Sequence, residues 1–503
     1  MSEQIIEGIL AAFTFKHLLI CLLGVALGTL VGVLPGLGPV GAISMLLPIT
    51  FSMEPLAALI LIAGIYFGGM YGGSTTSILV NVPGEAASVV TTLDGYKMTQ
   101  KGRAGAALSI AAIGSFVAGT IGVILLTFMA PPLARMALKF GPPEYFSIVL
   151  VGLLVLSRMT DKSLIRSYLL IACGIVISVI GIDPVSGGLR LTFGLPSLFD
   201  GLDFIPVIMG LYGLSEVLSA WENNDTKPVK ADLSFRKLLP TKNEFKRSTG
   251  PMVRGGLLGF IMGLIPGPAS ILSTYASYGL EKRLSKHPEE FGEGAIEGVA
   301  GPESANNGAS TGALVPLLSL GVPFSPLPAI LLSAFMIQGI TPGPMMIQDH
   351  PTIFWALIAS MYIGNVMLLI LNLPMVGLFA KIAHLRSAVL MPIVLIFCIV
   401  GAFSVRSSMA DVVIMVIFGA LGYLLRKAKM EPSPLVLGVM LGPTLENSFN
   451  QSTLIFKGDL TMFLTRPISG TLLILGILVT VWPLIMKLVR MLTSKNKHTA
   501  AKE

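Results

Sequence analysis

Hydroxyl and carboxamide side chains are concentrated in two short segments of this chain, at 71–85 and 305–311. Ser, Thr and Asn cap new helices and leave free backbone N–H groups that favour anions. Their side-chain oxygens are also ligands for a hard cation such as Na⁺. The alternative is that they only hydrogen-bond neighbouring helices. The residues that we expect to line a site for a small ligand or ion are Ser74, Thr75, Thr76, Asn81, Asn306, Asn307, Ser310 and Thr311.

Two segments that combine Pro with Gly interrupt apolar runs, at 34–39 and 265–268. Pro removes a backbone donor and Gly adds conformational freedom, so a helix should break at each of them. One interpretation is a simple kink. The other is a binding site, because irregular backbone is tolerated in hydrocarbon only where protein or a water-filled cavity satisfies it. The glycines that we assign to this site are Gly36, Gly38 and Gly267.

A stripe of glycines spaced four residues apart precedes each break. The two stripes are Gly24, Gly28 and Gly32, and Gly255, Gly259 and Gly263. Residues spaced by four lie on one face of a helix, and a face of small residues lets two backbones approach closely. We therefore expect these stripes to serve helix packing rather than ligand binding.

Catalytic chemistry has no support in the sequence. The five histidines are scattered, and no segment matches the P-loop, HExxH or CxxC patterns. An intramembrane enzyme would need a nucleophile–base pair or a GxGD motif, and Gly458-Asp459 lacks the first Gly. We expect a protein that is not an enzyme and has no cofactor.

The composition excludes a soluble fold. Of 503 residues, 53% are hydrophobic and 12% are charged, whereas soluble domains carry about 25% charged residues. The net charge of +7 indicates basic cytoplasmic loops rather than nucleic-acid binding, since Lys and Arg collect there in membrane proteins. The chain is expected to be an all-α polytopic membrane protein embedded in a lipid bilayer.

Three carboxylates lie in or beside the two polar segments: Glu85, Glu297 and Glu303. An ionisable group at membrane depth is a candidate functional group by default, so each could carry a proton or a cation. Glu85 could instead lie at the membrane interface, and Glu303 could cap a half-helix. No choice between these roles follows from the sequence.

The two halves of the chain are related. Residues 24–36 align without gaps to 255–267 with six identities. Repeats of a membrane fold with paired broken helices are typical of secondary transporters. We expect about 10–12 transmembrane segments in two repeats, some of them re-entrant or discontinuous.

The Lys and Arg distribution predicts that the repeats are inverted. Loop 221–250 is basic and is placed in the cytoplasm, whereas 342–351 has no Lys or Arg and is placed outside. The predicted parts are a first membrane repeat at 17–220, a cytoplasmic linker at 221–250, a second repeat at 251–467, a final transmembrane helix at 468–490 and a cytoplasmic tail at 491–503.

Four motifs give the chain a resemblance to a known family. They are G-x-L-P-G-L-G-P at 32–39, Y-G-G-S-T-T-S-I-L-V-N-V-P-G-E at 71–85, L-D-G-Y-x-M at 93–98 and G-x-E-S-A-N-N-G-A at 301–309. With these motifs the chain resembles, over essentially its whole length, the large membrane subunit of tripartite tricarboxylate transporters, the TctA family.

The resemblance implies a carrier of the bacterial inner membrane that takes up tricarboxylates or related small carboxylates. It implies two protein partners, a small four-span TctB-like membrane subunit and a periplasmic TctC-like solute-binding protein. It also implies that an ion gradient drives transport, with Na⁺ or H⁺ as the coupling ion. The alternatives are an intramembrane enzyme and a passive anion channel.

Overall fold

The computed structural model describes residues 2–33, 38–81, 83–160, 164–183, 186–222, 239–383, 387–478 and 480. Their regular structure is helical apart from one hairpin of two-residue strands, so the prediction of an all-α fold is confirmed. The chain divides into two compact units. Unit 1 holds Met1–Leu138 and Leu202–Lys429, and unit 2 holds Lys139–Gly201 and Met430–Glu503.

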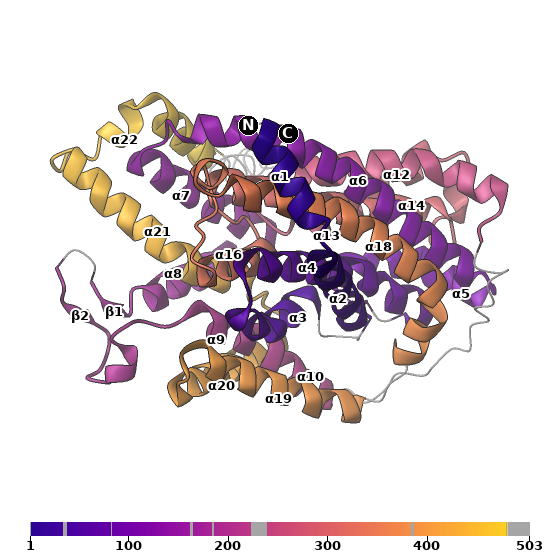
Figure 1. Ribbon diagram of the computed structural model, residues 1–503, viewed down its shortest axis with the longest axis horizontal. Coiled ribbons are helices and arrows are strands. Elements are labelled where there is room, and N and C mark those ends of the chain that lie inside the picture. The colour runs from indigo at the N-terminus through magenta and orange to yellow at the C-terminus, as the bar shows by residue number, and fades with distance from the viewer. Residues whose placement is uncertain are drawn as a thin grey trace, which may run out of the picture. The chain divides into compact units, whose positions relative to one another are not determined.

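Unit 1 contains most of the helices (Figure 1). In chain order they are α1 (Ser2–Ala12), α2 (Phe15–Gly32), α3 (Gly38–Leu46), η1 (Leu47–Ser52), α4 (Pro55–Val80), η2 (Ala86–Ser88), α5 (Val89–Gln100), α6 (Ala104–Ala137), α9 (Phe204–Ile208), η4 (Met209–Leu214), α10 (Ser215–Glu222), α12 (Lys242–Gly263), α13 (Ala269–Leu284), η5 (Pro288–Glu290), α14 (Glu297–Gly312), α15 (Leu314–Leu320), α16 (Pro326–Ile337), α17 (Met346–Asp349), α18 (Pro351–Ala383), α19 (Ser387–Arg406) and α20 (Met409–Lys427).

Unit 2 is smaller. Its elements are α7 (Pro142–Thr160), α8 (Leu164–Ser178), β1 (Gly181–Ile182), β2 (Leu189–Arg190), η3 (Pro196–Leu198), α21 (Ser433–Ile455), α22 (Met462–Thr465) and an apolar helix at Pro467–Leu478. An ion pair between the buried Glu144 and the half-buried Arg466 joins its two chain segments, with Glu144 Oε1 2.8 Å from Arg466 Nε. Residues 479 and 481–490 of the predicted final helix at 468–490, and the whole tail at 491–503, lie outside the described residues.

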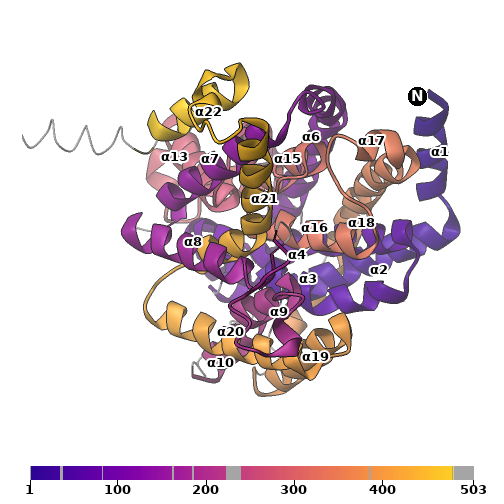
Figure 2. The same ribbon diagram turned by 90° about the vertical axis from the view of Figure 1, so that its left-hand side faces the viewer.

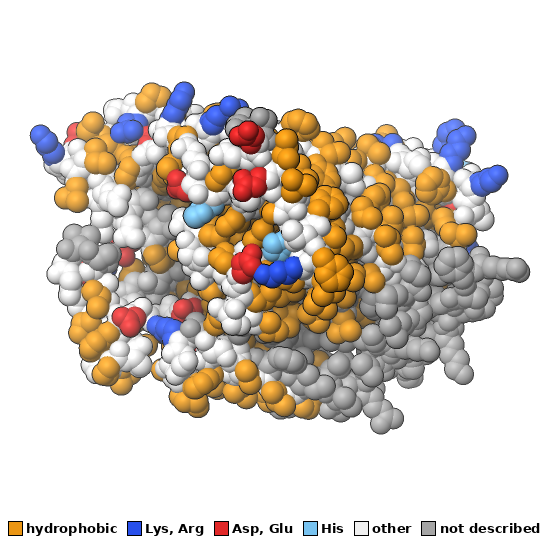
Figure 3. Space-filling view, viewed as in Figure 1, with side chains coloured by type: hydrophobic (Ala, Val, Ile, Leu, Met, Phe, Trp, Pro, Cys, Tyr) orange, Lys and Arg blue, Asp and Glu red, His pale blue; other side chains and the backbone are white. Residues whose placement is uncertain are grey.

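Several helices are suited to a bilayer. Five described helices are long and apolar enough to cross it: Phe15–Gly32, Pro55–Leu79, Ala104–Ala137, Pro351–Leu373 and Met409–Lys427. Shorter apolar helices add to these, and the total of about 10–12 spans stays a prediction. Exposed apolar side chains cover the face where α1, α2 and α18 lie (Figure 3), as expected for a surface that faces lipid.

The N-terminal helix lies beside α18, as two perpendicular views show (Figures 1 and 2). Its packing face includes Gly8, where an added Cβ would stand 2.6 Å from Trp355 Cβ. Glycine thus allows α1 to lie close against the longer helix.

Both glycine stripes serve close helix packing. An added Cβ at Gly28 of α2 would stand 2.4 Å from the carbonyl oxygen of Ile65 in α4, and one at Gly259 of α12 would stand 2.1 Å from that of Ala305 in α14. No side chain fits at such distances, so the backbones of each pair lie in contact. The packing role predicted for the stripes is confirmed.

The chain leaves helical geometry at the second Pro–Gly segment. Helix α12 ends at Gly263 and α13 begins at Ala269. Between them Gly267 has φ of +138°, and its N–H donates a 3.1 Å hydrogen bond to the carbonyl of Phe324. The predicted break is therefore present in the second half.

The first Pro–Gly segment is described only at its edges. Helix α2 ends at Gly32, and Gly38 is the first residue of α3. Gly36, which we assigned to a site, lies outside the described residues.

The compact units do not follow the predicted boundary between repeats. Each unit takes residues from both sides of the predicted linker, and the linker itself lies within the second segment of unit 1. Within that linker, α10 extends to Glu222 and α12 begins at Lys242, behind a capping box in which Thr241 and Glu244 exchange hydrogen bonds. Residues 223–238 lie outside the described residues, and the predicted division stays a prediction.

Candidate functional site

Helix α14 is the centre of the polar interior of unit 1. Every residue from Glu297 to Gly312 is buried. The helix packs against α4, α5, α6, α12 and α13, and its close approach to α12 rests on glycines. It carries two carboxylates and two carboxamides, so its polar groups must find partners inside the protein.

The carboxylate of Glu303 is bound by two hydroxyl groups from the first half of the chain. Ser74 of α4 donates to its Oε2, and Thr91 of α5 donates to its Oε1. Only 1% of Glu303 is exposed. Three helices therefore meet at one buried acidic side chain.

The two neighbouring asparagines reach toward different helices. Asn306 Nδ2 donates a 2.5 Å hydrogen bond to Oε1 of Glu85, in the turn after α4. Asn307 Nδ2 donates a 2.7 Å hydrogen bond to Ser115 Oγ of α6. The Oδ1 atoms of both asparagines are buried and have no hydrogen-bond partner among the described residues. Two strong acceptors thus remain unused.

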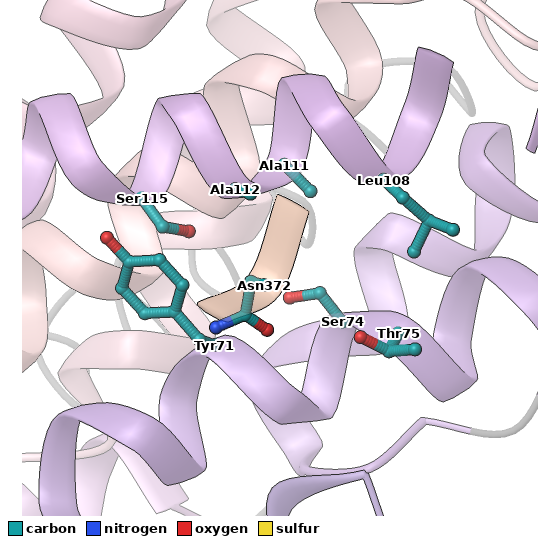
Figure 4. A pocket seen from close by; sticks show the side chains of 8 residues that line it. All are labelled: Tyr71, Ser74, Thr75, Leu108, Ala111, Ala112, Ser115 and Asn372. Carbon is teal, nitrogen blue, oxygen red and sulfur yellow. The ribbon is translucent and has the colours of Figure 1, made fainter. Parts of the chain in front are cut away.

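A small pocket lies next to this network, between α4 and α6 (Figure 4). Figure 4 shows Tyr71, Ser74 and Thr75 on one helix facing the other, with Asn372 of α18 between them. The lining residues are Tyr71, Ser74, Thr75, Leu108, Ala111, Ala112, Ser115 and Asn372. Its free space is about that of one water molecule. A larger ligand could enter only after the helices separate.

The structure brings together only part of the predicted site. Ser74 and Thr75 line the pocket, and Asn306 and Asn307 lie in the adjoining network. The hydroxyls of the other three buried residues donate to backbone carbonyls of their own helices: Thr76 to Gly73, Ser310 to Asn306 and Thr311 to Asn307.

The remaining predicted residues lie apart from this network. Asn81 is exposed and ends α4 in a left-handed conformation, with φ of 57°. Gly267 lies in the break between α12 and α13, and Gly38 begins α3. The described geometry thus offers no contact that joins these three residues to the pocket.

Among the uncharged polar residues of the pocket and network, Tyr71, Thr91, Ser115 and Asn372 were not predicted. Tyr71 begins the first polar segment and Thr91 follows it closely, so their positions were a usable signal. Asn372 is a carboxamide in an apolar helix, and such residues usually face the protein interior. Ser115 carries no signal, because small hydroxyl residues are common in packed membrane helices.

Glu297 differs from Glu303, because a cation neutralises it. Its Oε1 accepts a 2.7 Å hydrogen bond from Arg247 Nε, and the same guanidinium contacts Glu290 at 2.5 Å. The hydrogen bond from Arg247 holds the pKa of Glu290, outside the spanning segments, below its usual value. Glu297 therefore belongs to a structural ion-pair network.

A second structural anchor joins the halves nearby. The Oδ1 atom of Asp94 in α5 accepts hydrogen bonds from the backbone N–H groups of Gly292, Gly294 and Ala295 at 2.7–2.9 Å. Asp94 is fully buried. These bonds fix the segment that leads into α14.

Comparison with known proteins gives a consistent result. Residues 18–437 match the family model described as the tripartite tricarboxylate transporter TctA family. A 52.8 kDa protein of the TAR-I ttuC′ 3′ region of Agrobacterium vitis is 47% identical over 470 residues, which cover 93% of each chain. A protein of the TAR-II ttuC′ 3′ region of the same organism is 47% identical over 227 residues, covering 45% of this chain and 94% of its own. No solved structure matches the chain.

Proposed function

The chain belongs to the TctA family of tripartite tricarboxylate transporters, and we propose that it imports tricarboxylates or related small carboxylates, driven by a cation gradient. Family membership makes it the membrane subunit of a transporter and confirms that it is not an enzyme. The substrate class, the direction of transport and the driving ion go beyond family membership and are part of our proposal.

The partners and location follow from the same proposal. The chain is placed in the bacterial inner membrane, together with a small four-span TctB-like subunit and a periplasmic TctC-like solute-binding protein. The five long apolar helices support a membrane location. The periplasmic protein would deliver the carboxylate to the outer mouth of the large subunit.

The observation that carries the proposal is the polar pocket between α4 and α6. Its lining carries the hydroxyls of Tyr71, Ser74 and Thr75 and the carboxamide of Asn372. In this conformation Tyr71 donates to Asn365 and Ser74 donates to Glu303, so both hydroxyls would turn to reach a ligand. Hydrogen bonds to a charged group are worth about 1.5–3 kcal/mol each, so a few such donors suit a carboxylate.

The pocket has no basic lining residue, and this supports cation coupling. A multiply charged anion loses its hydration on entering such a site, which is very costly unless another charge offsets it. A cation that binds nearby and travels with the substrate would provide that charge.

The pocket's size and the repeats support alternating access. Space for about one water molecule is too little for a carboxylate with several carbon atoms, so the described conformation corresponds to a closed state. The glycine contacts of α2 with α4 and of α12 with α14 are alike, which supports two repeats. We propose that the repeats are inverted and that movement around the pocket opens it to each side in turn.

The test is uptake of radiolabelled citrate and related carboxylates by cells that express all three components. Thr75→Val and Asn306→Ala should each reduce uptake about tenfold, with unchanged protein level in the membrane. The matched control is Thr29→Val, because the buried Thr29 of α2 donates to the backbone carbonyl of Val25 in its own helix and does not line the pocket. Wild-type uptake in both variants would leave these residues with a packing role.

Transport by proteoliposomes that contain the membrane subunits distinguishes a coupled carrier from a passive anion channel. Accumulation of the carboxylate above its outside concentration, when only a cation gradient is imposed, is the expected result. Equilibration without accumulation would contradict the proposal.

A further inference from the structure

Two buried or half-buried carboxylates next to the pocket have no cationic partner. Among the described residues, no Lys, Arg or His lies within ion-pair distance of Glu85 or Glu303. The other acidic groups packed around α14 have partners. Glu297 pairs with Arg247 and Glu281 pairs with Arg254. Asp94 accepts from three backbone N–H groups at Oδ1, although its Oδ2 has no hydrogen-bond partner among the described residues. A buried carboxylate without a partner is costly, so the site calls for a positive charge.

The groups around Glu303 have the chemistry of a site for a hard cation. Both of its carboxylate oxygens accept a hydrogen bond from a hydroxyl, one from Ser74 and one from Thr91. An ionised carboxylate can accept at both oxygens, as Glu303 does here. Carboxylate and hydroxyl oxygens are the ligands that hard cations prefer.

An unused acceptor provides independent evidence for a ligand. Asn306 is 1% exposed, and its carboxamide faces Glu85 through Nδ2. The Oδ1 atom of the same carboxamide has no hydrogen-bond partner among the described residues. Since buried acceptors are nearly always satisfied, this oxygen indicates a missing positive or donor group.

We propose that Glu303, Ser74, Thr91, Glu85 and Asn306 form a binding site for one Na⁺ ion. The ion would bind to the carboxylate oxygens of Glu303 and Glu85 and to the free oxygen of Asn306. Binding of Na⁺ by this site does not depend on the proposed function, and only its role in driving uptake rests on it.

Ser74 provides the link between the ion and the pocket. Its hydroxyl donates to Glu303 and also lines the pocket. When Na⁺ binds, the oxygen of Ser74 can turn its lone pair to the ion and its hydrogen toward the pocket. The same hydroxyl then donates to a substrate carboxylate. Ion binding thus prepares the pocket for an anion.

The experiment measures thermal unfolding of the purified chain in detergent, without substrate, in NaCl and in choline chloride of equal ionic strength. An ion that binds the folded state alone raises the unfolding temperature. We expect Na⁺ to raise it in the wild type and to have no such effect in Glu303→Gln. Thr91→Val, which keeps the carboxylate, should need about tenfold more Na⁺ for the same effect.

The matched control is Glu144→Gln. Glu144 is as well buried as Glu303, but it pairs with Arg466 in unit 2. This variant should unfold at a lower temperature in both salts and keep the response to Na⁺. If Glu303→Gln fails to fold, Thr91→Val decides the question.

Two results would overturn the proposal. One is a wild-type protein whose unfolding temperature is the same in NaCl and in choline chloride. A protein whose unfolding temperature changes with pH but not with Na⁺ belongs to this case. The other is a Na⁺ response that Glu303→Gln keeps and that Thr91→Val shows at the same Na⁺ concentration as the wild type. If Na⁺ stabilises the protein but no carboxylate is taken up, the ion site stands and the proposed function fails.

Discussion

The hydroxyl of Tyr71 donates a 2.7 Å hydrogen bond to Oδ1 of Asn365, and this contact joins α4 to α18. Asn365 in turn donates from Nδ2 to the carbonyl of Phe116 at 2.9 Å and to Thr120 Oγ1 at 3.0 Å, both on α6. One carboxamide therefore connects the three helices that surround the pocket.

Loss of the Tyr71 hydroxyl should destabilise the helix cluster. Tyr71→Phe leaves Oδ1 of Asn365 buried without its partner, which costs about 1–3 kcal/mol. We expect a lower unfolding temperature in detergent, measured by intrinsic fluorescence. Tyr423→Phe is the control, since Tyr423 donates to Glu222 at the exposed end of α20 and should change little. Equal effects of the two substitutions would contradict a stabilising role for the hydrogen bond between Tyr71 and Asn365.

Removal of the Asp94 carboxylate should have a larger effect. Asp94→Ala leaves three backbone N–H groups without their acceptor, at about 1–3 kcal/mol for each group that water does not reach. We expect little folded protein in the membrane, measured by fluorescence-detected size-exclusion chromatography. Asp94→Asn keeps one acceptor oxygen and should be milder. If Asp94→Ala gives wild-type yield, the segment before α14 is held by other contacts.

The ion pair between Glu290 and Arg247 should contribute a small, pH-dependent stability. Because Arg247 lowers the pKa of Glu290 in the folded protein, the contribution is present above the usual value of 4.5 and is lost as pH falls. Glu290 is partly exposed, so we expect less than about 1 kcal/mol. The unfolding temperature of Glu290→Gln should be below wild type at neutral pH, and the difference should shrink below pH 4.5. Glu289→Gln, at a more exposed position, should show no such trend.

Substitution at the helix break should disturb both folding and uptake. At φ of +138° a side chain is strained, so Gly267→Ala should cost about 1–3 kcal/mol. The control is Gly279→Ala in α13, where an added Cβ meets nothing within 4 Å. Carboxylate uptake and membrane protein level are measured for both.

The aligned glycine of the first half extends this test to the repeats. If the two breaks are functional counterparts, Gly36→Val and Gly267→Val should abolish uptake to a similar degree. Normal uptake by one of them beside an inactive other would contradict the equivalence.

Inverted topology is tested by labelling cysteines from outside the cell. Gln348→Cys and Asn243→Cys place thiols at exposed positions, one in the loop assigned to the outside and one in the linker assigned to the cytoplasm. The starting protein is Cys173→Ser, because Cys173 is exposed whereas Cys21 and Cys398 are buried. A membrane-impermeant maleimide should modify position 348 and spare 243. The opposite pattern would reverse the assigned orientation.

The glycine stripes and the second break were predictable from sequence, because both depend on local backbone requirements. A stripe at Gly255, Gly259 and Gly263 leaves room for one neighbouring helix wherever that helix comes from. Pro266 and Gly267 disfavour helical geometry by themselves. Neither prediction required knowledge of the tertiary partner.

The contacts of Glu303 could not be predicted in this way. Its partners Ser74 and Thr91 are more than two hundred residues away in sequence, on two different helices, and only the packing of α4 and α5 against α14 brings them together. Asn81 shows the opposite case. It shares a polar segment with Ser74, but the left-handed end of α4 leaves it exposed.

The complete burial of α14 has a consequence for how the chain is made. A helix that enters the bilayer alone exposes its side chains to lipid, where a charged residue near its centre costs about 2.5–3.5 kcal/mol on the scale of insertion experiments. Helix α14 contains Glu297, Glu303, Asn306 and Asn307. It should therefore fail to insert during synthesis until α4 and α12 are already present to receive it. The ribosome finishes α4 long before α14, so this order of synthesis suits the order of assembly.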